Sequence, residues 1–202
     1  MKLIGLFDSP YVRRVAVSMR LQGFSFEHVA LSVFRHIDEM KKINPLVKVP
    51  MLVLDDGEQL IESSFILDYL DGEVAADQRL VPPAGAGRRK ILQHCAVALI
   101  GAEKAVQLYY ETALRPSEHT YRLWADRCTA QMHDAFAMLE SLPESPLLGG
   151  APITQADITS AVALRFARYA HPTHFPLERY PRLERLSAYC EALPAFVDTP
   201  LE

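Results

Sequence analysis

Paired cysteines are missing from this sequence. Its three cysteines, Cys95, Cys128 and Cys190, are odd in number and widely spaced, and no Cys-x-x-Cys segment occurs. Disulfide-stabilised domains and zinc knuckles need paired or closely spaced cysteines. The sequence therefore predicts a protein that folds without disulfides or zinc, in a reducing compartment.

A strong excess of charge is also missing. The formal net charge is only −4 at pH 7. Nucleic-acid binding depends on a dense positive surface that attracts phosphates, and its strength falls steeply with salt. We therefore expect no nucleic-acid partner.

Long hydrophobic runs are lacking as well. The apolar run at the N-terminus is far shorter than the core of a signal peptide and is broken by Asp8, and no later run has the length of a membrane span. We expect no membrane association and a cytoplasmic location. What the chain does have is an ordinary globular composition, with 50% hydrophobic and 23% charged residues over 202 positions.

The first part of the chain alternates between strand and helix patterns. Residues 2–7 form a short apolar run with strand character, and residues 8–10 supply a helix cap and a proline suited to a first helical turn. Apolar residues then recur with helical spacing from Pro10 to Gln22, before Gly23 at the position of a C-terminal cap. The other face of this helix, predicted to be exposed, carries Arg13, Arg14 and Arg20.

A second strand and a hairpin follow. Residues 26–31 read as a strand, which with the first strand and helix predicts a right-handed parallel βαβ unit. After a loosely helical stretch at 38–43, two apolar runs at 51–54 and 59–61 are joined by an Asp-Asp-Gly turn, which predicts a β-hairpin. Helical spacing returns at 63–70.

Beyond this point the strand pattern does not return. Residues 77–87 contain a Pro-Pro pair and the run Ala-Gly-Ala-Gly, which predicts a linker. Long helical patterns then occupy residues 88–114, 118–141, 155–170 and 183–192. The sequence thus predicts an α/β domain at 1–76, a linker at 77–87 and an all-α domain at 88–202.

Three short segments of the first domain could carry chemistry. Pro50 begins the first hairpin strand, where a cis bond would present the backbone of Val49 to a ligand; the trans preference before proline is only about 0.5–1 kcal/mol, and an ordinary trans proline is the alternative. Glu62 and Ser63 open the next helix, where free N–H groups and a hydroxyl can bind a carboxylate or simply cap the helix. Ser9 precedes a proline-initiated helix, where it either caps the helix or stabilises a thiolate.

The order and spacing of these segments carry a resemblance. Residues 9–15, 44–52 and 61–70 resemble the N-terminal domain of the glutathione transferase superfamily. Residues 153–158 are similar to the folding motif of its helical domain, with Thr154 and Asp157 as a variant capping box. The resemblance implies a thioredoxin-like N-terminal domain, a C-terminal helical bundle and a cytoplasmic homodimer with a role in detoxification.

The resemblance also implies a glutathione site. Val49, next to the cis-proline Pro50, would pair its backbone with the cysteinyl part of glutathione, and Glu62 and Ser63 would hold the γ-glutamyl end. Lys48, with a basic residue at Arg35 or His36, would reach the glycyl carboxylate. Ser9 would hydrogen-bond the sulfur, lower the thiol pKa and so increase the thiolate nucleophile.

The implied reaction is attack of the glutathione thiolate on a small hydrophobic electrophile. Val106, Tyr109 and Tyr110 are candidates for the electrophile pocket, with core packing as the alternative for at least one of them. A glutathione-binding or regulatory protein without turnover stays an alternative. Thiol reduction or isomerisation is less favoured, because no cysteine precedes Cys95 and residues 8–11 depart from the Ser-Ser-Cys run of the isomerases.

No metal is expected. His171 and His174 could offer two imidazoles, but no carboxylate or cysteine lies nearby at a complementary spacing. The prolines around them predict a surface loop.

Overall fold

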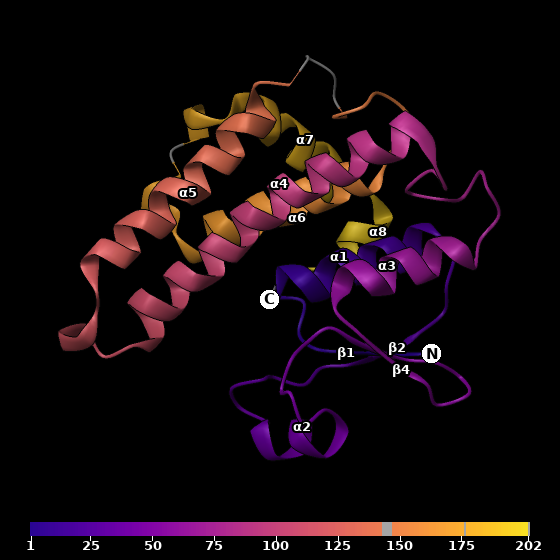
Figure 1. The fold of residues 1–202 in the computed structure, drawn as a ribbon, viewed down its shortest axis with the longest axis horizontal. Helices are drawn as coiled ribbons and strands as arrows, with labels where there is room; N and C mark the ends of the chain where they lie inside the picture. Colours follow the sequence, from indigo (N-terminus) through magenta and orange to yellow (C-terminus); the bar gives the residue numbers. More distant parts are fainter. Residues whose placement is uncertain (143–146, 176, 202) are drawn as a thin grey trace. The chain divides into compact units, whose positions relative to one another are not determined.

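A computed structural model describes residues 1–142, 147–175 and 177–201 of the chain (Figure 1). Contacts divide it into two compact units, Met1–Leu80 with Leu193–Glu202, and Val81–Ala192. The chain after position 192 therefore groups with the first unit, whereas the predicted helical domain extended to position 202. The predicted classes, α/β followed by all-α, are confirmed.

The first unit is built on a mixed sheet. Its described residues form four strands in the order β2-β1-β3-β4. β1 pairs with β2 in parallel and with β3 in antiparallel fashion, and β3 pairs with β4 as the predicted hairpin. The strands are β1 (Lys2–Ile4), β2 (Glu27–Val29), β3 (Met51–Val53) and β4 (Gln59–Ile61).

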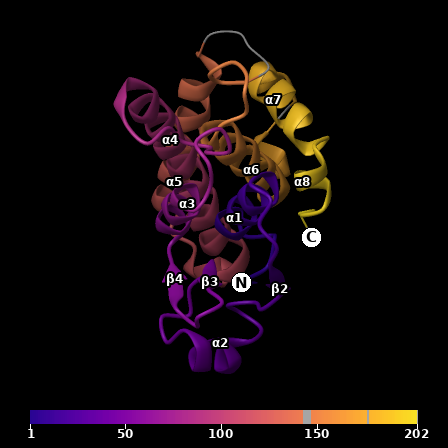
Figure 2. The same ribbon diagram turned by 90° about the vertical axis from the view of Figure 1, so that its right-hand side faces the viewer.

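Helices cover both faces of this sheet. Figure 1 and Figure 2 place α1 and α3 on one face and α2 on the other. Successive strand residues point to opposite faces, so Leu3 packs in the core beneath α1 and α3 while its neighbour Ile4 packs against Met40 of α2. The helices of this unit are α1 (Pro10–Leu21), α2 (Ile37–Ile43), α3 (Ser63–Gly72) and α8 (Pro194–Val197).

The two ends of α1 agree with the sequence pattern. Ser9 is its N-cap and Pro10 its first residue. After the helix, Gly23 has φ +79°, and the N–H groups of Gly23 and Phe24 donate to the carbonyls of Arg20 and Met19 at 3.2 and 2.9 Å. This pair of bonds is a Schellman motif, for which glycine is the preferred residue.

The prediction that Arg13 and Arg14 are exposed is wrong. Their side chains are 1% and 3% exposed. Arg13 Nε donates to the carbonyl of Thr199 at 2.7 Å, and its guanidinium lies 5.6 Å from the centre of the Phe196 ring. The chain after position 192 packs on α1 and covers Arg13, a contact that helical spacing within α1 cannot reveal.

The second unit is a bundle of helices. Its long helices are α4 (Gly85–Tyr109), α5 (Arg122–Glu140), α6 (Gln155–Ala170) and α7 (Pro181–Glu191). α4 packs against α5 and α6, and α6 also packs against α7. A Cβ on Gly101 of α4 would lie 3.1 Å from Phe136 of α5, which explains a glycine in this helix. In the described part of the chain, no helix combines the length and the hydropathy needed to cross a membrane.

The start of α6 is held by a buried carboxylate. Asp157 Oδ2 accepts from the backbone N–H of Thr154 at 2.8 Å and from its hydroxyl at 2.7 Å. Asp157 Oδ1 accepts from the N–H of Leu148 at 2.6 Å. The predicted capping box is present, and the bond to Leu148 also ties the preceding loop to the helix.

Candidate functional site

The strand register places the predicted motifs at one end of the sheet. Ile4 at the end of β1 pairs with Val29 on one side and with Met51 on the other, and Met51 pairs with Ile61. β1 and β4 therefore end, and β3 begins, in one row across the sheet. The segments that enter or leave the sheet at this row contain Ser9, Val49–Pro50 and Glu62–Ser63.

Gly5 brings two of these segments into contact. It directly follows β1 and has φ +129°, a conformation that side chains rarely adopt. A Cβ at this position would lie 2.5 Å from Val12 Cγ2 on α1 and 3.0 Å from Val49 Cβ. Glycine therefore lets the start of α1 and the segment of Val49 approach each other. In the sequence, the only indication of this close approach is a single glycine at the end of the first strand.

Ser9 is half-buried at the N-terminus of α1. Its Oγ accepts from the N–H of Val12 at 3.4 Å, so the hydroxyl acts as the helix cap. A serine hydroxyl has one proton to donate and two lone pairs to accept. Capping uses a lone pair, and the proton remains available to an acceptor placed at the positive end of α1.

The Val49–Pro50 peptide bond is cis. Of the cis and trans forms considered from the sequence, the cis form is therefore confirmed. Pro50 is buried and Val49 is half-buried. Among the hydrogen bonds of the described residues, none involves the backbone of Val49. Among the described residues, then, the N–H and C=O of Val49 have no hydrogen-bond partner. The preceding Lys48 is exposed.

Glu62, the N-cap of α3, has an unusual backbone conformation. Its φ of +71° lies in the left-handed region, which a glutamate adopts only when its surroundings impose it. Glu62 Oε2 accepts from the N–H of Ser64 at 3.1 Å, and Oε1 accepts from the hydroxyl of Ser63 at 3.3 Å. Ser63 is buried and Glu62 is exposed. The carboxylate is thus fixed at the start of the helix.

A small hollow lies in the segment before and at the start of α2. It has a volume of about 260 Å³ and is lined by residues 34–39. Arg35 is exposed, and the ring of His36 is fixed because its Nδ1 accepts from the N–H of Ser32 at 3.0 Å. Two of the three basic residues considered for the glycyl carboxylate, Arg35 and His36, therefore border this hollow.

The residues predicted for the electrophile pocket lie in the second unit. Val106 and Tyr109 are half-buried near the end of α4, and Tyr110 is 43% exposed. Tyr110 begins a π-helical turn, η1 (Tyr110–Leu114), a feature frequent at functional sites. Glu111 in this turn is buried, where it accepts from the N–H of Tyr121 at 2.6 Å. That these aromatic residues face the sulfur of glutathione stays a prediction.

Comparison with known families decides the relationship. Residues 3–78 match the family described as glutathione S-transferase, N-terminal domain, and residues 123–191 match glutathione S-transferase, C-terminal domain. The chain belongs to the glutathione S-transferase superfamily. The segments that carried the resemblance in the first domain lie within the first match.

Individual members of the superfamily are similar over nearly the whole chain. Glutathione S-transferase Z2 of Arabidopsis thaliana is 28% identical over 209 residues, which cover 97% of this chain and 88% of the relative. A crystal structure of a glutathione transferase family member from Pseudomonas fluorescens with bound glutathione has a TM-score of 0.88 at 29% identity, covering 100% and 98% of the two chains. A glutathione S-transferase from Methylobacterium radiotolerans in complex with glutathione sulfonate has a TM-score of 0.91 at 27% identity, covering 98% and 93%.

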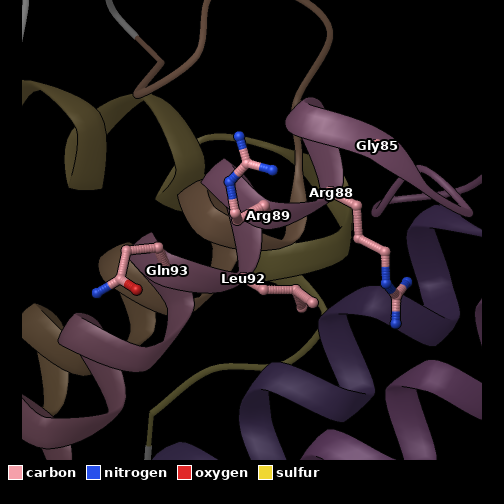
Figure 3. A pocket seen from close by; sticks show the side chains of 5 residues that line it. All are labelled: Gly85, Arg88, Arg89, Leu92 and Gln93. Atoms are coloured by element: carbon pink, nitrogen blue, oxygen red, sulfur yellow. The ribbon is translucent and has the colours of Figure 1, made fainter.

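A second hollow lies at the start of α4, between the two segments that match the family models. It has a volume of about 440 Å³ and is lined by Gly85, Arg88, Arg89, Leu92 and Gln93. Figure 3 shows the guanidinium groups of Arg88 and Arg89 pointing in different directions. The two cations therefore do not converge on one ligand position.

A buried histidine cluster occupies the second unit. His133 Nδ1 lies 2.8 Å from the hydroxyl of Tyr180, and His171 Nε2 lies 2.8 Å from the carbonyl of Ala105. Burial, with the nearby Arg179 and His174, lowers the pKa of His133 to about 4. Burial also lowers the pKa of His171, which is buried rather than part of a surface loop as predicted. Among the residues described, no group of three or more potential metal ligands is found.

Proposed function

We propose that this protein activates the thiol of glutathione and joins glutathione, through its sulfur, to a small hydrophobic electrophile. The observation that carries the proposal is the convergence of the Ser9, Val49 and Glu62–Ser63 segments at one end of the sheet. Two family members of known structure, at 29% and 27% identity, contain glutathione and glutathione sulfonate. We further propose residues 1–76 as the glutathione-binding domain.

The proposed binding mode matches each part of glutathione to a group of the first unit. The N–H and C=O of Val49, beside Pro50, pair with the cysteinyl backbone of the ligand. The γ-glutamyl end carries an ammonium and a carboxylate, which fit the carboxylate of Glu62 and the N-terminus of α3 at Ser63. Lys48, with a basic residue at Arg35 or His36, supplies the positive charge for the glycyl carboxylate.

Ser9 is the proposed catalytic residue. A free thiol with a pKa near 8.5 is mostly protonated at neutral pH. A hydroxyl proton donated to the sulfur, together with the N-terminal end of α1, favours the thiolate and lowers that pKa. The thiol proton passes to solvent. The sulfur lone pair then forms a bond to the electrophilic carbon, whose leaving group departs with its bonding electrons.

Other parts of the proposal rest on family membership. We propose that Val106, Tyr109 and Tyr110 contribute an apolar wall for the electrophile, that the protein is a cytoplasmic homodimer without a metal cofactor, and that its reaction serves detoxification. Sedimentation as a monomer would refute the dimer. The tyrosine-rich wall predicts a preference for aromatic over aliphatic electrophiles of equal intrinsic reactivity.

The test compares Ser9→Gly with the parent. Glycine is tolerated at an N-cap with a loss of only a few tenths of a kcal/mol, so this variant removes the hydroxyl with little effect on α1. Glutathione binding is measured by calorimetry, the bound thiolate by its ultraviolet absorbance, and turnover with an activated chloronitrobenzene. We expect Ser9→Gly to bind glutathione but to lose the thiolate signal, with kcat/KM about 10- to 100-fold lower at neutral pH.

Two other outcomes decide against parts of the proposal. If the parent binds glutathione without any thiolate signal, the protein is a non-catalytic glutathione-binding protein. If the parent fails to bind glutathione in the calorimeter, the ligand assignment itself is wrong. Ser9→Thr, which keeps both the cap and the hydroxyl, is the matched control and should retain the thiolate signal.

A further inference from the structure

Asn44 closes the loop that leads from α2 to Val49. It is the only asparagine of the chain and is 4% exposed. Its Nδ2 donates to the carbonyl of Lys48 at 3.0 Å, and its Oδ1 accepts from the N–H of Leu46 at 3.0 Å. One buried side chain thus holds both the middle and the end of this loop.

The loop contains a strained residue that these bonds hold in place. Val47 has φ +50°, in the left-handed region, where a β-branched side chain is a genuine outlier. Its N–H donates to the carbonyl of Asn44 at 3.0 Å. Such conformations persist only where the surroundings over-determine them, and they cluster at ligand-binding segments.

Val49 is therefore fixed from two sides. On one side, Asn44 holds the carbonyl of Lys48, which is joined to the N–H of Val49 by a single planar peptide unit. On the other side, the Val49 side chain packs where a Cβ of Gly5 would lie. Because the Lys48 carbonyl and the Val49 N–H share one plane, the hydrogen bond from Asn44 also sets the direction of that N–H.

We infer that Asn44 is a positioning residue for glutathione, acting through the backbone of Val49 without touching the ligand. The inference rests on the proposed function, because it needs glutathione to pair with that backbone. The loss of the Asn44 donor lets the Lys48–Val49 peptide unit rotate. Glutathione must then restore the direction of this peptide unit when it binds, and its affinity is lower as a result.

The deciding variant is Asn44→Asp. Aspartate has nearly the same shape and keeps an acceptor for the N–H of Leu46, but it has no donor for the carbonyl of Lys48. Gln59→Glu is the control, since it makes the same amide-to-acid change at an exposed position of β4. We expect the Kd for reduced glutathione to rise about tenfold in Asn44→Asp, the value of one net hydrogen bond, and to stay unchanged in Gln59→Glu. At saturating glutathione, kcat should stay within about twofold of the parent.

The single asparagine also allows a test in the parent that needs no variant. Labelling with [15N]asparagine yields one side-chain amide pair in an NMR spectrum. We expect this pair to exchange its protons with solvent slowly, and to shift when reduced glutathione is added. If Asn44→Asp fails to fold, this measurement decides alone.

The outcomes separate the inference from the proposed function. If the parent does not bind glutathione, the proposed function and the inference both fail. If the parent binds and Asn44→Asp binds equally tightly, or if the parent's amide pair exchanges as fast as a free amide, only the inference is overturned. An equal loss in Kd and kcat would also overturn it, because that pattern indicates a general structural defect.

Discussion

Replacing Asp157 by alanine should destabilise the second unit far more than the loss of an ordinary helix cap. A cap alone is worth about 1 kcal/mol. In the structure, however, the Asp157 side chain is fully buried and accepts three hydrogen bonds, two from Thr154 and one from Leu148. Alanine leaves the buried N–H of Leu148 without this acceptor, at about 1–3 kcal/mol. It also removes the acceptor from the half-buried N–H of Thr154, at about the 1 kcal/mol of an ordinary cap.

The expected loss is therefore about 2–4 kcal/mol, a large part of the ~5–15 kcal/mol that stabilises a typical protein. The chain has one tryptophan, Trp124, and it lies on α5 of the second unit, so its fluorescence follows the unfolding of that unit in urea. We expect a lower urea midpoint with an unchanged slope. Asp126→Ala on the same helix removes an exposed carboxylate and serves as the control. A loss of 1 kcal/mol or less in Asp157→Ala would refute the role of the Leu148 bond.

Two further predictions follow from Gly5 and from the buried histidines. Gly5→Ala should weaken glutathione binding at least tenfold in calorimetry, because its Cβ would lie 2.5 Å from Val12 and 3.0 Å from Val49; Gly57→Ala, with a similar φ of +92° and nothing within 4 Å, should bind as the parent does. Equal binding by both variants would contradict the contact between Gly5 and Val49. The pKa of His133 is about 4 in the folded protein and near 6.5 in the unfolded chain. As the pH falls, the unfolded chain therefore binds the proton before the folded protein does. The free energy of unfolding then decreases between pH 6.5 and pH 4. The loss should reach about 2–3 kcal/mol in urea titrations at successive pH values, and a pH-independent midpoint over this interval would rule it out.

Local signals in the sequence were sufficient for the order of the four strands and of helices α1 to α7, although the short α8 was not predicted and β1 ends at Ile4 rather than at residue 7. Ser9 and Pro10 begin α1, Gly23 closes it, and the Asp-Asp-Gly turn joins β3 and β4 as predicted. These signals work because caps and tight turns depend on residues within a few positions of one another. The motif spacing was also sufficient to indicate the superfamily.

The sequence pattern could not predict contacts between residues that are far apart in the chain. Arg13 is buried because Thr199 and Phe196, more than 180 positions away, pack on α1. The cost of losing Asp157 depends on Leu148, a partner outside its capping box.

For this protein, then, the sequence alone determined the classes of secondary structure, the caps of α1 and α6, the hairpin and the family. Only the tertiary structure decided that Ile4 of β1, Met51 of β3 and Ile61 of β4 are aligned across the sheet. This alignment places the three short motifs at one end of the sheet. It also decided the backbone direction at Val49, through Asn44 and Gly5. The physical reason is range: caps and turns are settled by neighbouring residues, whereas strand register and burial are settled by partners that the chain brings together only when it folds.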